Sequence, residues 1–302
     1  MGNDFWLPFA DGGAKSFTFD AGVYFAIKNL FGDDFVAMPA KIRLESSKAL
    51  AFRLLSGTNK FGKILEAKRE NGSIYYENSQ YFINKNNNYT FVAKCGDNCE
   101  KHNHNDVGCF DLVKGKDKIF ADLGAGNYTW AYHNDQTENG RYGKKIFVCG
   151  SWGHCVPIVN NRPQINRFRK DGSPYRGEVL FVDDNTFKMD IAKAYEGGVD
   201  SLIIEYKLKE NSINVNYECA NLKDSVAFRF ITEHEPKIID DGVSILGVEL
   251  KSKSNIKPKI EKVLFAGRDA HEKGVIMRTA YTIDFLILKS GNVKEEFEIE
   301  LN

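Results

Sequence analysis

Histidines and carboxylates gather in one segment in the first half of the chain. His102 and His104 stand two residues apart in His-Asn-His-Asn-Asp, and residues i and i+2 of an extended strand point to the same face. Asp122 follows in Phe-Ala-Asp-Leu-Gly, and His154 in Ser-Trp-Gly-His. Imidazole nitrogens and carboxylate oxygens are common zinc ligands. The pattern predicts a zinc-type site, and the alternative is that these are ordinary loop residues.

Cysteines flank these histidine motifs. Cys95 and Cys99 lie before the first motif, and Cys149 and Cys155 surround the second, so a mixed Cys/His metal site is the alternative ligand set. Neither spacing is the two-residue gap of zinc knuckles. Six cysteines in 302 residues are also too few for a disulfide scaffold. We therefore expect free structural thiols.

A basic stretch with interleaved aromatic residues follows the second histidine motif. It contains Arg162, Arg167, Phe168, Arg169, Lys170, Tyr175 and Arg176. Arginine pairs bidentately with carboxylate or sulfate groups, so this stretch could bind an acidic sugar. The alternative is a solvated loop.

Short segments of strand character follow one another after about residue 57. We expect strands over residues 89–93, 108–113, 118–122, 201–208, 213–219, 263–265, 280–289 and 295–301. In the fifth of these, Ile213, Val215 and Tyr217 alternate with polar residues, which indicates one buried and one solvated face. Many short strands with close turns predict a mainly β fold of antiparallel sheets stacked as a β-sandwich.

The N-terminal part of the chain has a helical pattern instead. Apolar residues recur at helical spacing over 20–31, namely Val23, Ala26, Ile27, Leu30 and Phe31. Asp20 is a suitable N-cap, and Gly32 suits the C-terminal end. A weaker pattern predicts a second helix over 47–55. We therefore expect a short helical segment over 1–57 and one large β-sandwich domain over 58–302.

The composition excludes several classes of function. Lys and Arg together number 41 and are balanced by 41 Asp and Glu, which argues against a nucleic-acid binder that works by bulk phosphate attraction. No apolar run has the length of a membrane span, so we expect neither nucleic acid nor membrane as a partner. Residues 1–12 lack a signal-peptide pattern. The chain alone therefore reads as cytoplasmic, and periplasmic or secreted if its natural N-terminus lies upstream.

The run from Lys94 to Asn161 resembles the signature of the heparinase II/III-like family of polysaccharide lyases. The segments that carry the resemblance are KCGDNCEKHNHNDVGCF, FADLGAGNYTWAY, Arg141 and SWGHCVPIVNNRPQ, with a weaker match over Asp190 to Tyr195. Such enzymes cleave uronic-acid-containing polysaccharides by β-elimination. The reaction requires a neutralised carboxylate, a base for the C5 proton and an acid for the leaving oxygen.

The resemblance also implies roles for particular residues. It implies that His102 is catalytic, that Tyr128 lies near the site and that Arg141 pairs with an anionic group of the substrate. The same resemblance implies one zinc ion, mainly structural, held by His104, Asp122 and His154.

Family members carry a long helical toroid before the sandwich, and it supplies the other half of the cleft. Here only about 55 residues precede the expected sandwich. We therefore expect half of a lyase, incomplete alone, whose partners are an acidic polysaccharide (glycosaminoglycan-like or alginate-like) and a missing toroid half. The alternative is a non-catalytic, zinc-containing, carbohydrate-binding β-sandwich.

Overall fold

The computed structural model describes residues 71–99, 103–127, 129–130, 146–165, 174–268 and 275–302, together with the two short strands 19–20 and 42–43. The chain divides into two compact units. One unit comprises Met1–Trp6 and Lys15–Glu70, and the other comprises Leu7–Ala14 and Asn71–Asn302. The expected boundary at residue 57 lies outside the described residues and stays a prediction.

In the N-terminal unit the structure describes one pair of short strands. β1 (Phe19–Asp20) pairs in parallel with β2 (Ile42–Arg43). Asp20, expected as a helix N-cap, is the last residue of β1. The rest of the helix expected over 20–31 and the helix expected over 47–55 lie outside the described residues.

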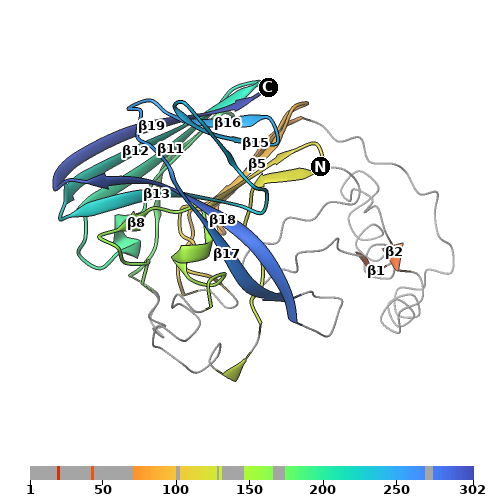
Figure 1. The fold of residues 1–302 in the computed structure, drawn as a ribbon, viewed down its shortest axis with the longest axis horizontal. Coiled ribbons are helices and arrows are strands. Elements are labelled where there is room, and N and C mark those ends of the chain that lie inside the picture. The colour runs from red at the N-terminus through yellow and green to blue at the C-terminus, as the bar shows by residue number, and fades with distance from the viewer. Residues whose placement is uncertain are drawn as a thin grey trace. The chain divides into compact units, whose positions relative to one another are not determined.

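An antiparallel sheet of eight strands forms one layer of the larger unit (Figure 1). In spatial order its strands are β14 (Lys237–Ile239), β15 (Gly242–Ile245), β16 (Val248–Ser252), β19 (Gly291–Leu301), β12 (Ser212–Leu222), β11 (Ser201–Leu208), β10 (Thr186–Asp190) and β9 (Glu178–Val182). The strands expected over 201–208 and 213–219 are β11 and β12, which pair as a hairpin. Ile213, Val215 and Tyr217 are buried as their alternation predicts.

Two smaller antiparallel sheets form the facing layer. The five-stranded sheet contains β3 (Gly72–Tyr76), β4 (Tyr81–Lys85), β5 (Thr90–Lys94), β6 (Phe110–Lys114) and β7 (Asp117–Phe120). The four-stranded sheet contains β17 (Lys259–Arg268), β18 (Val275–Leu288), β13 (Ser225–Thr232) and β8 (Ile158–Val159). The backbone N–H of Ala121, just after β7, donates to the carbonyl of Ile231 in β13 at 3.3 Å and links the two sheets. Two 3-10 turns, Ser151–Gly153 and Ala192–Ala194, complete the described elements.

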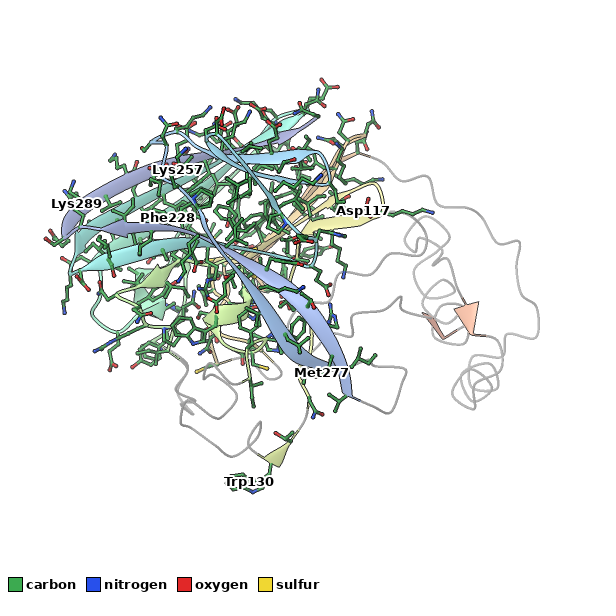
Figure 2. All side chains as sticks on the ribbon, viewed as in Figure 1. Asp117, Trp130, Phe228, Lys257, Met277 and Lys289 are labelled. Carbon is green, nitrogen blue, oxygen red and sulfur yellow. The ribbon has the colours of Figure 1, made fainter. Side chains whose placement is uncertain are left out.

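Aromatic side chains fill the space between the two layers. Tyr217 stacks on Phe228 with ring centroids 4.4 Å apart, and Figure 2 labels Phe228 on β13, the strand that faces the eight-stranded sheet. The ring centroid of Phe110 in β6 lies 5.4 Å from that of Tyr206 in β11 and 6.1 Å from that of Phe230 in β13. Such tilted and edge-to-face contacts add to the large apolar area that each ring buries. The predicted mainly β, sandwich-like fold is confirmed.

The hairpin of β17 and β18 extends beyond its sheet (Figure 1). β13 pairs with β18 only from Tyr281 onward, whereas residues 275–280 pair with β17 alone. Figure 2 shows Met277 near the far end of this hairpin.

Among the described residues, no helix has the length and apolar character needed to cross a membrane.

Candidate metal centre

The predicted ligand residues lie together in the structure. One potential ligand atom from each of His104, Asp122 and His154 lies within 4.8 Å of the others, and all three residues are buried. Nδ1 of His154 is 3.6 Å from Oδ2 of Asp122. The centroids of the two imidazole rings are 5.2 Å apart. We call these three residues the His/Asp cluster.

The state of His154 fits a metal ligand. Both of its ring nitrogens are buried, and neither has a hydrogen-bond partner in the part of the chain that the structure describes. Burial lowers the pKa of His154 below its usual value, despite the opposing effect of the Asp122 charge. A neutral imidazole has a lone pair available for a metal, whereas a buried polar atom without any partner destabilises the fold. Two histidines and one aspartate are a usual zinc donor set.

The end of β7 fixes the carboxylate of Asp122. Its backbone N–H donates to Oδ1 of Asp111 at 2.7 Å, and its own Oδ1 accepts from the N–H of Gly124 at 2.8 Å. Gly124 has a φ of +74°, which glycine adopts without steric cost. One carboxylate oxygen of Asp122 is thus held by the backbone, and the other is directed toward His154. Burial raises the pKa of Asp111 well above its usual range, and the charge of Asp122 acts in the same direction.

The segment between β5 and β6 carries His104 and is held by a buried ion pair. Nζ of Lys94 lies 2.9 Å from Oδ1 of Asp106, and the side chains are 1% and 0% exposed. Burial alone would raise the pKa of Asp106, but the charge and hydrogen bond of Lys94, together with His154 and His104, lower that pKa overall. Gly108 has a φ of +86°, and a Cβ there would lie 3.0 Å from Ile204. Lys94 and Asp106 therefore shape the His104 segment.

Sequence reasoning missed the roles of Lys94, Asp106 and Asp111. Asp106 stands in the polar histidine motif, which gives no sign of its burial. Lys94 and Asp111 have apolar neighbours in the chain, and a charged residue in such a context is a signal for a buried, paired group. That signal identifies a residue that needs a partner. It does not identify the partner.

The expected catalytic and substrate-binding residues His102, Tyr128 and Arg141 lie outside the described residues. In the sequence His102 directly precedes Asn103, which is described and buried. The assigned roles of all three residues stay predictions.

The six cysteines are free thiols. None of them belongs to the His/Asp cluster that the described residues form. Cys95, Cys149 and Cys155 are buried and Cys99 is partly exposed. Burial raises the pKa of Cys95 to about 12, so this thiol stays protonated. These observations agree with the expectation of structural thiols.

A polar groove of about 780 Å³ is lined in part by Gly96 and Asp97, which precede the histidine motif in the sequence. Its lining includes Tyr75, Glu77, Asp97, Arg176 and Glu178. Arg176 is the only residue of the expected basic stretch that lines this groove among the described residues, and three carboxylates accompany it. Residues 166–170 of that stretch lie outside the described part of the chain, so the acidic-sugar role of the stretch stays a prediction.

The fold is shared with solved heparan sulfate lyases. A structure of heparinase III superposes with a TM-score of 0.65 at 14% sequence identity, over 98% of this chain and 44% of that chain. A mutant of the heparan sulfate lyase HepC from Pedobacter heparinus superposes with a TM-score of 0.62 at 11% identity, over 99% of this chain and 44% of that one. The expected likeness to the heparinases is thereby confirmed at the level of fold.

The sequence by itself has no such match. No protein-family model and no curated protein matches the chain. The chain spans less than half the length of the solved lyases that it resembles.

Proposed function

We propose that this chain is the β-sandwich part of a zinc-containing polysaccharide lyase that cleaves an acidic, uronic-acid-containing polysaccharide by β-elimination. The observation that carries the proposal is the buried His/Asp cluster on a heparinase III-like fold. In the sequence, His104 of this cluster stands two residues after His102. His104, Asp122 and His154 would hold the zinc ion. When bound, the ion would cross-link three segments that are far apart in the sequence and fix their conformation.

The proposed chemistry assigns tasks to three further residues, namely His102, Tyr128 and Arg141. In β-elimination a base removes the C5 proton of the uronate, the C4–O bond breaks, a C4=C5 double bond forms, and the leaving oxygen takes up a proton. His102 lies two residues from a zinc ligand and is the proposed proton-transfer residue, since imidazole titrates near neutral pH. Tyr128 is the second proposed catalytic residue. Arg141 would pair with the substrate carboxylate, whose charge opposes C5 deprotonation.

A complete cleft in this proposal requires a second half. The chain spans 44% of the length of heparinase III, and the proposed partner is a helical toroid half like that of the family. We expect the isolated chain to have weak lyase activity or none.

The test combines metal analysis with a lyase assay. Purified protein is analysed for zinc by mass spectrometry, and its activity on heparan sulfate, chondroitin, hyaluronan and alginate is followed by the ultraviolet absorbance of the unsaturated product. We expect about one zinc per chain, and product formation that rises when an upstream helical region is supplied. Loss of that product in His102→Ala, with zinc retained, would support the role of His102. Absence of zinc from the native protein would reject the metal centre.

The burial of the whole His/Asp cluster favours a second candidate, a carbohydrate-binding β-sandwich that keeps the zinc but performs no chemistry. Isothermal titration with acidic oligosaccharides separates the two. Binding without any unsaturated product, even with the helical region present, would favour this candidate.

A further inference from the structure

Gln164 lies between the two segments that carry the histidines of the His/Asp cluster. It follows the turn after β8 in Asn-Arg-Pro-Gln and is 2% exposed. It is not a member of the cluster. A buried amide side chain needs partners for two donors and one acceptor oxygen, because each group left without one destabilises the fold.

The side-chain amide of Gln164 binds both backbone groups of a single residue. Its Nε2 donates to the carbonyl of Val107 at 2.7 Å, and its Oε1 accepts from the N–H of Val107 at 3.0 Å. Val107 stands three residues after His104. Two simultaneous hydrogen bonds fix the orientation of a peptide segment as well as its distance, so Gln164 holds the His104 segment in one position.

The backbone of Gln164 connects to the other histidine. Its N–H donates to Oγ of Ser151 at 2.9 Å, and Ser151 stands three residues before His154. The Ser151 hydroxyl in turn donates to the carbonyl of Asn105 at 2.8 Å, next to His104. Nδ2 of Asn105 donates back to the carbonyl of Gln164 at 3.0 Å. The ring of hydrogen bonds therefore includes both histidine-bearing segments.

Further partners complete the network. Nδ2 of Asn98 donates to Oε1 of Gln164 at 3.1 Å, and the second Nε2 proton of Gln164 is directed to the hydroxyl of Tyr195 at 3.2 Å. That hydroxyl donates to the carbonyl of Pro157. All groups of the Gln164 amide are satisfied, which favours one fixed position of this side chain. Elsewhere in the network, the Oδ1 atoms of Asn98 and Asn105 have no hydrogen-bond partner among the described residues.

We infer that Gln164 is a positioning residue for the metal centre, which sets the separation of His104 and His154 through Val107 and Ser151. This inference rests on the proposed zinc site. Metal affinity depends on how well the ligands are held before the metal arrives, and outer groups that orient ligands typically change affinity by about 10–100-fold.

The test uses the full chain with two substitutions at the network and one control. Gln164→Met keeps the side-chain length and removes the amide, and Ser151→Ala is a smaller change that removes only the hydroxyl bridge. Asn84→Leu is the matched control, since Asn84 is buried, donates to the carbonyl of Asp184, and lies in β4 outside the cluster. The zinc dissociation constant is measured by competition with a chelator, together with the visible spectrum of the cobalt(II)-loaded protein and the urea midpoint of the metal-free protein.

We expect Gln164→Met to weaken zinc binding by about 10–100-fold and to change the cobalt(II) absorption bands, which report ligand geometry. Ser151→Ala should act in the same direction with a smaller effect, and it tests the inference if Gln164→Met does not fold. Asn84→Leu should lower the urea midpoint and leave both metal readouts unchanged.

Two outcomes would overturn the inference in distinguishable ways. Native zinc affinity and a native cobalt(II) spectrum in both network variants would reduce Gln164 to a structural role and leave the proposed function standing. A native protein that binds neither metal would remove the metal centre itself, and with it both proposals.

Discussion

Two regions of the β-sandwich are equally buried but are stabilised in different ways. The buried polar region consists of Lys94, His104, Asp106, Asp122, His154 and Gln164. The aromatic core consists of Tyr217, Phe228, Phe230, Phe285 and Phe297. In the core each ring contacts several others, so the stabilisation is spread over many small, non-directional contacts. In the polar region stabilisation depends on specific partners, such as Lys94 for Asp106, and a lost partner leaves a buried charge or hydrogen-bonding group uncompensated. A single substitution should therefore disable the polar region, whereas the core should respond gradually.

The largest effect is expected at the metal centre. Asp122→Ala removes the carboxylate of the His/Asp cluster, and zinc content should fall from about one per chain to near zero, because two histidines alone do not complete a zinc site. Mass spectrometry of metal content after dialysis gives the measurement. Full retention of zinc by this variant would reject the ligand assignment.

The next effect concerns the buried ion pair. Lys94→Met leaves the Asp106 carboxylate buried without its cation, which should lower the free energy of unfolding by about 3–5 kcal/mol. Urea denaturation monitored by circular dichroism is the measurement. The double variant Lys94→Met/Asp106→Leu should recover most of the lost free energy of unfolding, because neither charge of this ion pair then remains buried. If the double variant is as unstable as the single one, the loss of stability arises from packing. The buried polar region would then respond to substitution in the same way as the aromatic core.

A conservative substitution in the core should lower the free energy of unfolding less than Lys94→Met does. Ile283 of β18 is fully buried, and Ile283→Val removes one methylene at a cost of about 0.5–1.5 kcal/mol. The same urea experiment measures it, and zinc content should not change. A drop in the zinc content of Ile283→Val would show that the core and the buried polar region are coupled, and the two regions would then not respond independently.

The smallest effect is expected on the surface. Lys193 and Glu178 form an ion pair at 3.0 Å with both side chains more than half exposed. Lys193→Ala should change the free energy of unfolding by less than about 1 kcal/mol, because water and salt screen exposed pairs. A loss as large as that of Lys94→Met would mean that burial does not explain the difference between the two pairs.

Eight strands of the sandwich were predicted from local patterns, whereas others, such as β13 (Ser225–Thr232), were not. In β12, alternation of Ile213, Val215 and Tyr217 with polar residues identified the buried face, because the side-chain period of a strand is two. The turn between β6 and β7 falls on Lys-Gly-Lys-Asp, a polar sequence with a glycine, and Gly115 has a φ of +61°. The extension of the β17–β18 hairpin was not predictable, because the pairing of a strand depends on which neighbours the sheet offers.

The members of the His/Asp cluster were predictable, whereas the groups that support them were not. Residue type and spacing pointed to the His102/His104 pair, Asp122 and His154 as a zinc-type set, and the family resemblance selected the last three. The structure brings these three together, and their role as zinc ligands stays a prediction. The role of Gln164 depends on hydrogen bonds to the backbone of Val107, and any residue has the same backbone groups. No sequence pattern identifies such a partner.

The sequence by itself determined where strands form and which side chains can bind a metal, because both follow from local periodicity and from the chemistry of single residues. Only the tertiary structure decided that Asp122 lies 3.6 Å from His154 and that Lys94 neutralises Asp106. These contacts join segments that are distant along the chain. Their energy depends on burial, and burial exists only when the sheets have packed against each other.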